Sequence, residues 1–221
     1  MKFEERHYSS HLIRPRPLVY IDPSEGFVLV MTAWGATETT QRALEHVKQY
    51  LQAVRQDNEL TTPFQNILSL SDAANDLRVA ALMANDLVFR NLNQDRYDAV
   101  FEICFLNIRN RRVAWSQMGC PHLFIRKKNQ KPQPISCFPE SRSELSGFPI
   151  PVCFLGSEPT IAPRCGDFYL SHGDEIILLS SSTIPEAIWK ISEESSLEEW
   201  TDKIAMADGA QPFWLGRLQI D

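Results

Sequence analysis

The chain has 221 residues, of which 43% are hydrophobic and 23% are charged, and its formal net charge is −6. These values are typical of a globular protein that buries a core of its own, and they favour a single domain over residues 1–221. The negative charge excludes a general binder of nucleic acids or of anionic membranes.

The first part of the chain predicts one buried strand and two long helices. Residues 26–31 (GFVLVM) are β-branched and almost wholly apolar, which is typical of a strand buried on both faces. Apolar residues then recur at three- and four-residue steps over residues 37–55, and this period predicts an amphipathic helix. A second helix is expected over residues 71–91, with Ser71 or Asp72 as its N-cap.

The middle of the chain changes to the period of β-strands. Residues 98–107, 113–117 and 122–127 are rich in β-branched and aromatic side chains and are joined by short turns, so we expect an antiparallel meander of three strands. Residues 128–151 contain five of the fourteen prolines. We expect this segment to be a long irregular loop or flap.

The last part predicts short strands that alternate with helices. Strands are expected at residues 152–155, 167–170, 176–179 and 213–220. Helices are expected at 186–191, where Thr183 and Glu186 fit a capping box, and at 197–206. The Gly-Asp pairs at 166–167 and 173–174 predict turns. Helices and mostly antiparallel strands in this order predict an α+β fold.

Sequence features also bear on the compartment. The five cysteines include no CxxC pair, so neither a disulfide framework nor a structural zinc site is expected. The first ten residues (MKFEERHYSS) lack the apolar core of a signal peptide, and no stretch approaches the roughly 18 apolar residues of a membrane span. We therefore expect a cytoplasmic protein without a membrane partner.

Three local patterns carry possible chemistry. Ser180, Ser181 and Ser182 follow a buried strand, but no nucleophile-elbow motif surrounds them, so they predict a polar strand exit. Cys120 and His122 are two residues apart, which suits either a weak thiol–imidazole pair or a half-buried cysteine in a turn. The arginines of RPRP, Arg14 and Arg16, suit either a grip on phosphate or a solvated extended segment.

The order of elements and three phrases resemble the metal-dependent type 2C serine/threonine protein phosphatase (PPM) family. The family's V-A-D-G-M-G-G corresponds to VMTAWGA (residues 30–36), and its N-V-G-D-S-R corresponds to SQMGCPH (residues 116–122). Its G-D-x-L-L-L-C-S-D-G corresponds to GDEIILLSSS (residues 173–182). The resemblance implies a four-layer α-β-β-α sandwich, in which two central, mainly antiparallel sheets are flanked by helix pairs.

The resemblance also implies a reaction that this chain lacks the residues to perform. Family members hold two divalent metal ions with strand-end aspartates, and hard cations such as Mg²⁺ and Mn²⁺ need such oxygen anions. Thr32, Cys120 and Ser181 stand where the resemblance implies aspartates, and Ala33 stands where it implies a glycine whose backbone carbonyl serves the metal. We therefore expect no metal cofactor, and a degenerate member of the family, a pseudophosphatase, that keeps Arg14 for a possible contact with phosphate.

The expected function is regulatory or scaffolding binding of a protein partner, such as a kinase, a phosphoprotein or a signalling complex. One alternative is a divergent active phosphatase that holds Mg²⁺ or Mn²⁺ with displaced ligands, and the candidates for these are Asp167, Asp174 and Asp208. A second alternative is a structural or assembly protein whose degenerate pocket binds nothing. Fold alone does not separate these functions.

Overall fold

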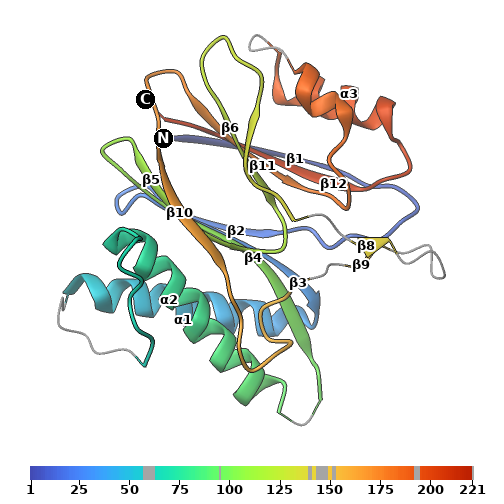
Figure 1. Cartoon of the computed structure of the whole chain (residues 1–221). Coiled ribbons are helices and arrows are strands. Elements are labelled where there is room, and N and C mark those ends of the chain that lie inside the picture. Colours follow the sequence, from blue (N-terminus) through green and yellow to red (C-terminus); the bar gives the residue numbers. More distant parts are fainter. Residues whose placement is uncertain are drawn as a thin grey trace. The chain divides into compact units, whose positions relative to one another are not determined.

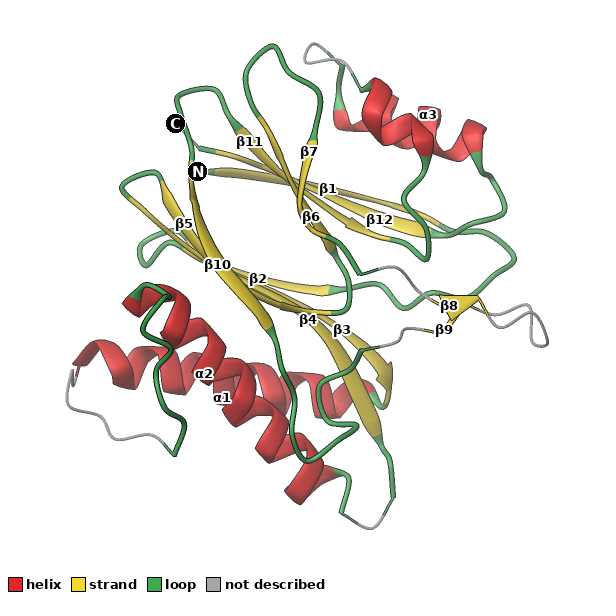
Figure 2. Cartoon of the chain, in the orientation of Figure 1, coloured by secondary structure: helices red, strands yellow, loops and turns green. Residues whose placement is uncertain are grey.

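The computed structural model describes residues 1–56, 63–94, 96–138, 141–142, 149–150, 153–191 and 195–220. The chain forms two compact units, each built on one five-stranded antiparallel sheet (Figures 1 and 2). The terminal unit comprises Met1–Pro17, Gly119–Val152 and Leu170–Asp221, and the central unit comprises Leu18–Met118 and Cys153–Tyr169. That the chain is one domain over residues 1–221 stays a prediction.

The central unit is a sheet with two long helices on one face (Figure 2). Its helices are α1 (Thr37–Gln56) and α2 (Asp72–Leu87), which continues as the π-helix η1 (Val88–Leu92). The strands in spatial order are β10 (Arg164–Tyr169), β5 (Arg112–Met118), β4 (Ala99–Arg109), β3 (Phe27–Gly35) and β2 (Leu18–Asp22).

The apolar period of the central unit explains this packing. Every second residue at the start of β3 (Phe27, Leu29 and Met31) faces the core beneath the helices, where the apolar stripes of α1 and α2 cover them. Burial of this area drives the helices onto the sheet. As expected, Ser71 caps α2, and its hydroxyl accepts a hydrogen bond from the backbone N–H of Ala74.

The terminal unit carries its helices on a second sheet. Its strands in spatial order are β1 (Lys2–Tyr8), β12 (Phe213–Gln219), β11 (Glu175–Ser180), β6 (His122–Arg126) and β7 (Gln133–Ser136). The 3-10 helix η2 (Glu186–Lys190) and the α-helix α3 (Leu197–Ala207) pack on it through a core that includes Ile177, Leu179, Leu215 and the fully buried Trp200. A small two-stranded sheet joins β8 (Ser141–Arg142) to β9 (Pro149–Ile150).

Several local predictions are wrong. The expected meander is divided, because β4 and β5 pair in the central unit whereas β6 pairs with β11 in the terminal unit. Gly119 adopts a φ of 73° between β5 and β6, a conformation that suits glycine, and the chain leaves the first sheet there. The capping box lies at Ser196 and Glu199 of α3, whereas η2 begins after Pro185 without a side-chain cap.

The proline-rich segment contains regular strands, contrary to the expected irregular loop. Residues 133–136 form β7 on the edge of the terminal sheet, where they pair with β6. Residues 139–140, 143–148 and 151–152 of the expected flap lie outside the described residues. Strands β1 and β2 were not predicted, because charged residues interrupt the apolar pattern of KFEERHY and LVYID is short.

Candidate functional site

The serine run follows a fully buried strand of the terminal unit, β11. All six residues of β11 are buried, because the strand lies in the sheet between β12 and β6. The strand ends at Ser180, and Ser181 and Ser182 beyond it are also buried, each with at most 3% of its surface exposed. Buried hydroxyls need hydrogen-bond partners, so their neighbours define what this strand end does.

Arg14 is one of these neighbours. Its Nε donates to Ser180 Oγ at 3.1 Å and its Nη1 to Ser182 Oγ at 3.5 Å, although the residues are more than 160 positions apart in the chain. Arg14 is only 8% exposed. A guanidinium therefore lies beside the strand end where the resemblance implies a carboxylate.

We define the serine cluster as Arg14, Cys120, His122 and Ser180–Ser182. Within it, Ser181 makes the contacts to Cys120 and His122. The Ser181 carbonyl accepts from His122 Nε2 at 3.1 Å and from Cys120 Sγ at 3.4 Å, and its hydroxyl donates to the carbonyl of Thr183 at 2.6 Å. The backbone N–H of Phe138 donates to His122 Nδ1 at 3.2 Å. These bonds fix the imidazole tautomer: Nδ1 accepts, so Nε2 carries the proton.

This geometry decides between the two interpretations of the cysteine and histidine pair. His122 is fully buried, and burial lowers its pKa to about 4, while the bond to Ser181 acts to raise the pKa and the charge of Arg14 to lower it. Cys120 Sγ lies 3.8 Å from the protonated Nε2, which has no lone pair to accept the thiol proton. His122 thus does not act as a base toward Cys120, and the pair is a buried turn.

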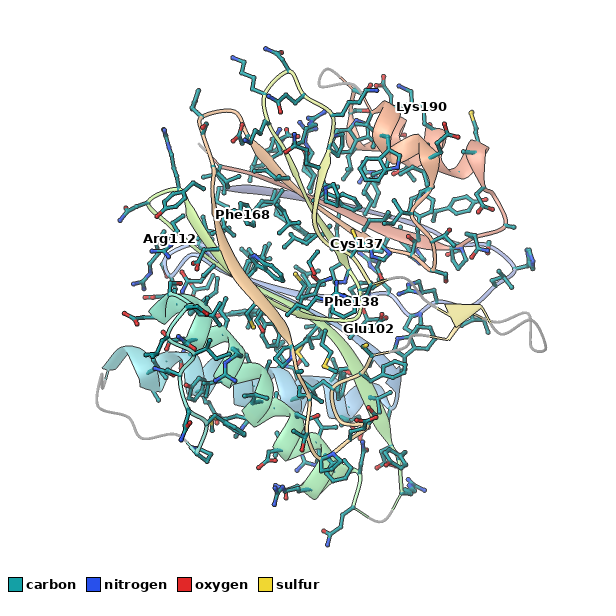
Figure 3. All side chains as sticks on the ribbon, viewed as in Figure 1. Glu102, Arg112, Cys137, Phe138, Phe168 and Lys190 are labelled. Atoms are coloured by element: carbon teal, nitrogen blue, oxygen red, sulfur yellow. The ribbon has the colours of Figure 1, made fainter. Side chains whose placement is uncertain are left out.

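Thr32 and Ala33 belong to the central unit. Thr32 is fully buried on β3, and its hydroxyl has no hydrogen-bond partner within the described residues. Directly opposite on β4 lies Glu102, whose side chain is labelled in Figure 3. Glu102 is 1% exposed and accepts a hydrogen bond from Trp34 Nε1 at 2.9 Å. Glu102 was not among the predicted site residues. A lone carboxylate inside an apolar strand was the available signal, because buried charges need partners.

The residues at the family's metal-ligand positions do not fit two divalent cations. Thr32, Ala33, Cys120 and Ser181 offer only hydroxyl, thiol and carbonyl groups, and those of Cys120 and Ser181 are used in hydrogen bonds within the cluster. Mg²⁺ and Mn²⁺ prefer anionic oxygen ligands. Among the described residues, no three His, Cys, Asp or Glu side chains are grouped so that they could share a metal ion.

The two arginines of RPRP have different surroundings. Arg14 is buried against the serines, whereas the side chain of Arg16 is 57% exposed and forms an ion pair with Glu5. The carboxylate of Glu5 also accepts a hydrogen bond from Trp214 Nε1 at 2.8 Å. Of the two candidates for phosphate binding, only Arg14 therefore contacts the serine cluster.

The three candidate displaced ligands have structural contacts. Asp167 lies within β10 rather than in the predicted turn, and it accepts from Ser71 Oγ at 2.7 Å and from Arg112 Nε at 3.2 Å. Asp174 lies in a turn as expected and accepts from the backbone N–H groups of Ser171 at 2.8 Å and Lys128 at 3.1 Å. Asp208 is the C-cap of α3.

Comparison with solved structures connects this fold to known enzymes. The chain is similar to the Mycobacterium tuberculosis serine/threonine phosphatase PstP/Ppp, with a TM-score of 0.66, 12% identity and coverage of 100% of this chain and 99% of the other. The chain has the fold of this phosphatase. The Streptococcus agalactiae (S. agalactiae) serine/threonine phosphatase matches with a TM-score of 0.63, 15% identity and full coverage of both chains.

A third similar structure is PppA of Pseudomonas aeruginosa, described as a key regulatory component of T6SS, with a TM-score of 0.65, 11% identity and coverage of 99% and 97%. No protein-family model and no curated protein sequence matches the chain. The expected α+β fold with two antiparallel sheets and flanking helices is confirmed. No helix of the described chain is both long and apolar enough to span a membrane.

Proposed function

We propose that this chain is a type 2C phosphatase-like protein without catalytic activity, a pseudophosphatase that acts as a regulatory or scaffolding module for a protein partner in the cytoplasm. The observation that carries the proposal is the serine cluster. At two positions where an active phosphatase of this fold would need metal-binding carboxylates, this chain has the neutral Cys120 and Ser181, and the carbonyl of Ser181 accepts from Cys120 and His122. The buried Arg14 bonds to the hydroxyls on either side, those of Ser180 and Ser182.

Physical chemistry supports this assignment. Two metal ions that activate water require several anionic ligands to hold them close together. The hydroxyls of Thr32 and Ser181 and the thiol of Cys120 supply none of that charge, and the Arg14 guanidinium adds electrostatic repulsion toward a cation placed near Ser180 and Ser182. The apolar cores of the two units keep the fold, since burial stabilises them without any metal.

The description of one similar structure supports a regulatory kind of partner. PppA, whose structure this chain resembles, is described as a regulatory component. We propose a partner of a comparable kind, such as a kinase, a phosphoprotein or a signalling complex. Arg14 is the candidate contact for a phosphate group on such a partner, because a guanidinium beside two hydroxyls offers several hydrogen-bond donors to phosphate oxygens.

Metal-binding calorimetry and a hydrolysis assay test the loss of catalysis. Mn²⁺ and Mg²⁺ are titrated into the full chain, and hydrolysis of a small aryl phosphate is followed with Mn²⁺ and after addition of a chelator. We expect no binding at micromolar concentration and no chelator-sensitive hydrolysis, with the mycobacterial PstP as the positive control. Two micromolar sites or chelator-sensitive turnover would establish the alternative, an active enzyme with displaced ligands.

Fluorescence titration with a phosphoserine peptide tests the role of Arg14. We expect Arg14→Ala to weaken binding about tenfold, the loss of a charge-assisted hydrogen bond. Arg16→Ala is the matched control, because Arg16 is exposed and bound to Glu5 outside the serine cluster. Equal binding by wild type and Arg14→Ala, each shown to be folded by circular dichroism, would remove phosphate binding from the proposal.

A further inference from the structure

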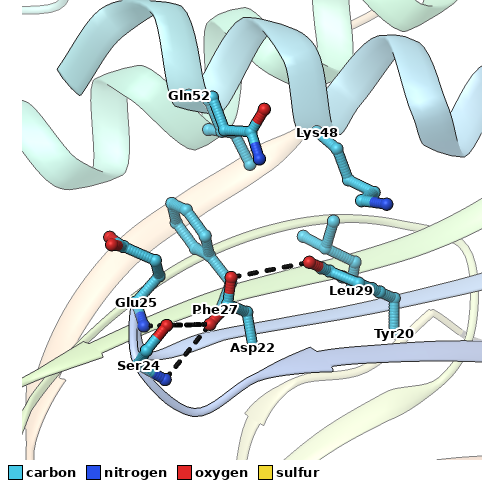
Figure 4. Close-up of a pocket in the computed structure, with 9 residues that line it drawn as sticks. Tyr20, Asp22, Ser24, Glu25, Phe27, Leu29, Lys48 and Gln52 are labelled. Carbon is cyan, nitrogen blue, oxygen red and sulfur yellow. Dashed lines mark hydrogen bonds between the residues drawn. The ribbon is translucent and has the colours of Figure 1, made fainter. Parts of the chain in front are cut away.

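Many basic side chains of this acidic chain have a carboxylate partner within the fold. Lys48 is one example, and it lines a cavity of about 450 Å³ between α1 and the turn from β2 to β3 (Figure 4). Its ammonium group is 2.9 Å from Glu45 Oε1 and lies over the ring of Tyr20, 4.4 Å from the ring centroid. The chain itself therefore supplies the cation of this cavity.

A hairpin in the terminal unit differs, because its lysines have no such partner. Strands β6 and β7 are joined by residues 127–132 (KKNQKP), which include three lysines and no acidic residue (Figure 2). We call Lys127, Lys128 and Lys131 the lysine tip. All three side chains are exposed, and none of them forms an ion pair within the described residues. A chain with a net charge of −6 thus carries a local surplus of positive charge here.

Hydrogen bonds hold the backbone of the lysine tip in one conformation. The N–H of Gln130 donates to the carbonyl of Lys127 at 2.9 Å, which closes a turn, and Asn129 within this turn adopts a φ of 59°. The N–H of Lys128 donates to Asp174 Oδ1 at 3.1 Å and so ties the tip to the turn that precedes β11. A surface that is already ordered loses less conformational entropy when a partner binds to it.

Two carboxylates adjoin the tip, and both are engaged within the fold. Asp174 is 4% exposed and accepts from two backbone N–H groups, including that of Lys128. Glu175 lies opposite Arg126 in the sheet and is bonded by both Arg126 and Arg217. Together with the lysine tip, these groups comprise five cations and two carboxylates, so the surplus of positive charge remains.

The small extent of this surplus selects the class of partner. Exposed charges are screened beyond about 8 Å at physiological ionic strength, so a short acidic segment is attracted by the lysine tip with little effect from the rest of the chain. A nucleic-acid duplex or an anionic membrane contacts a wider surface, where the net charge of −6 repels it. Residues 127–131 also lack an apolar side chain that could insert into a membrane. These observations favour an acidic segment of a protein.

We propose that the lysine tip binds an acidic segment of a protein partner, with carboxylates of that segment beside Lys127, Lys128 and Lys131. Each of these exposed contacts contributes little by itself, so the three lysines act together. Complementary charge of this kind also increases the rate at which the partner associates. The lysine tip shares no residue with the serine cluster, and its biological role rests on the proposed function as a binding module.

Two capped synthetic peptides with an uncharged fluorophore test the site. One alternates glutamate with serine, and the other has glutamine in place of each glutamate. Binding to the full chain is measured by fluorescence anisotropy, and the contact is mapped by amide shifts in NMR spectra. We expect the glutamate peptide to bind about tenfold more tightly, because each of three exposed ion pairs contributes a factor of about two. The largest shifts should occur in residues 127–131, and about 0.5 M salt should abolish the preference.

The test variant replaces the lysine tip by glutamine: Lys127→Gln, Lys128→Gln and Lys131→Gln. The matched control removes the same number of exposed positive charges elsewhere: Arg42→Gln, Arg111→Gln and Lys190→Gln. We expect the test variant to lose the preference for the glutamate peptide and the control to retain it. Equal affinity for both peptides, an unchanged preference in the test variant, or an equal loss in the control would each overturn the proposal. So would shifts confined to other residues, or tighter binding of duplex DNA or of phosphatidylserine vesicles than of the glutamate peptide.

Failure of the lysine tip to bind is distinguishable from failure of the proposed function. Chelator-sensitive hydrolysis by a chain that still prefers the glutamate peptide would overturn the proposed loss of catalysis and leave the lysine tip established as a binding surface. A chain without metal binding that shows no preference for the glutamate peptide would have the opposite consequence.

Discussion

The buried imidazole of His122 predicts that acid destabilises this protein. Its pKa is lowered from 6.5 to about 4 by burial, so the unfolded chain binds a proton near neutral pH more readily than the folded chain does. The stability linked to His122 is therefore fully present above pH 6.5 and is lost as the pH falls toward 4. The free energy of unfolding should therefore decrease by about 2 kcal/mol between pH 7.5 and 5 through this one residue, and by about 3 kcal/mol near pH 4.

Urea denaturation at pH 7.5 and at pH 5 measures this change in wild type and in His122→Asn. Other groups also titrate in this range, so the informative quantity is the difference between the pH dependences of the two proteins. Wild type should lose about 2 kcal/mol more than the variant. If the variant does not fold, NMR titration of the His122 ring in wild type replaces it. An equal pH dependence in both proteins, or a His122 that titrates near 6.5 in the folded state, would refute the reasoning.

Three further predictions concern buried polar groups and a buried thiol. Asn75→Ala should lower the free energy of unfolding by about 1–3 kcal/mol. The reason is that the Asn75 amide accepts from the N–H of Ile67 at 2.9 Å and donates to the carbonyl of Ile67 at 3.0 Å. An unchanged midpoint of urea denaturation would contradict this. Trp34→Phe should cost a similar amount, about 1–3 kcal/mol, by removing the indole donor to the buried Glu102, and the loss should shrink in the double variant with Glu102→Gln. Cys104 is fully buried and burial raises its pKa to about 12, so a maleimide followed by mass spectrometry should label it only after unfolding; rapid labelling of the folded protein would show that the site is accessible.

The elements that the sequence predicted correctly are those with strong local signals. The apolar periods of residues 37–55 and 197–206 correspond to α1 and α3, and the apolar runs at 26–31 and 176–179 correspond to parts of β3 and β11. The missed strand β1 has four charged residues among its seven in addition to a histidine, and its pairing with β12 joins the two ends of the described chain. Such a strand is defined by its partner rather than by its own composition.

The absence of carboxylates at the candidate site could be predicted from the sequence, whereas the hydrogen bonds of the site could not. The motif comparison identified Thr32, Cys120 and Ser181 as positions without carboxylates, which requires only the order of residues. It did not predict that Ser181 offers its carbonyl to both His122 and Cys120, or that Arg14 donates to Ser180 and Ser182. Those partners are distant in the sequence, and local patterns carry no information about such pairs.

The sequence by itself determined which stretches bury an apolar face and which side chains at the motif positions are neutral. Only the tertiary structure decided which strands share a sheet, which nitrogen of His122 holds the proton, and that Glu102 lies opposite Thr32. The physical reason is that hydrophobic period is a property of neighbouring residues, whereas strand pairing, tautomer and buried charge depend on groups that folding brings together from distant parts of the chain.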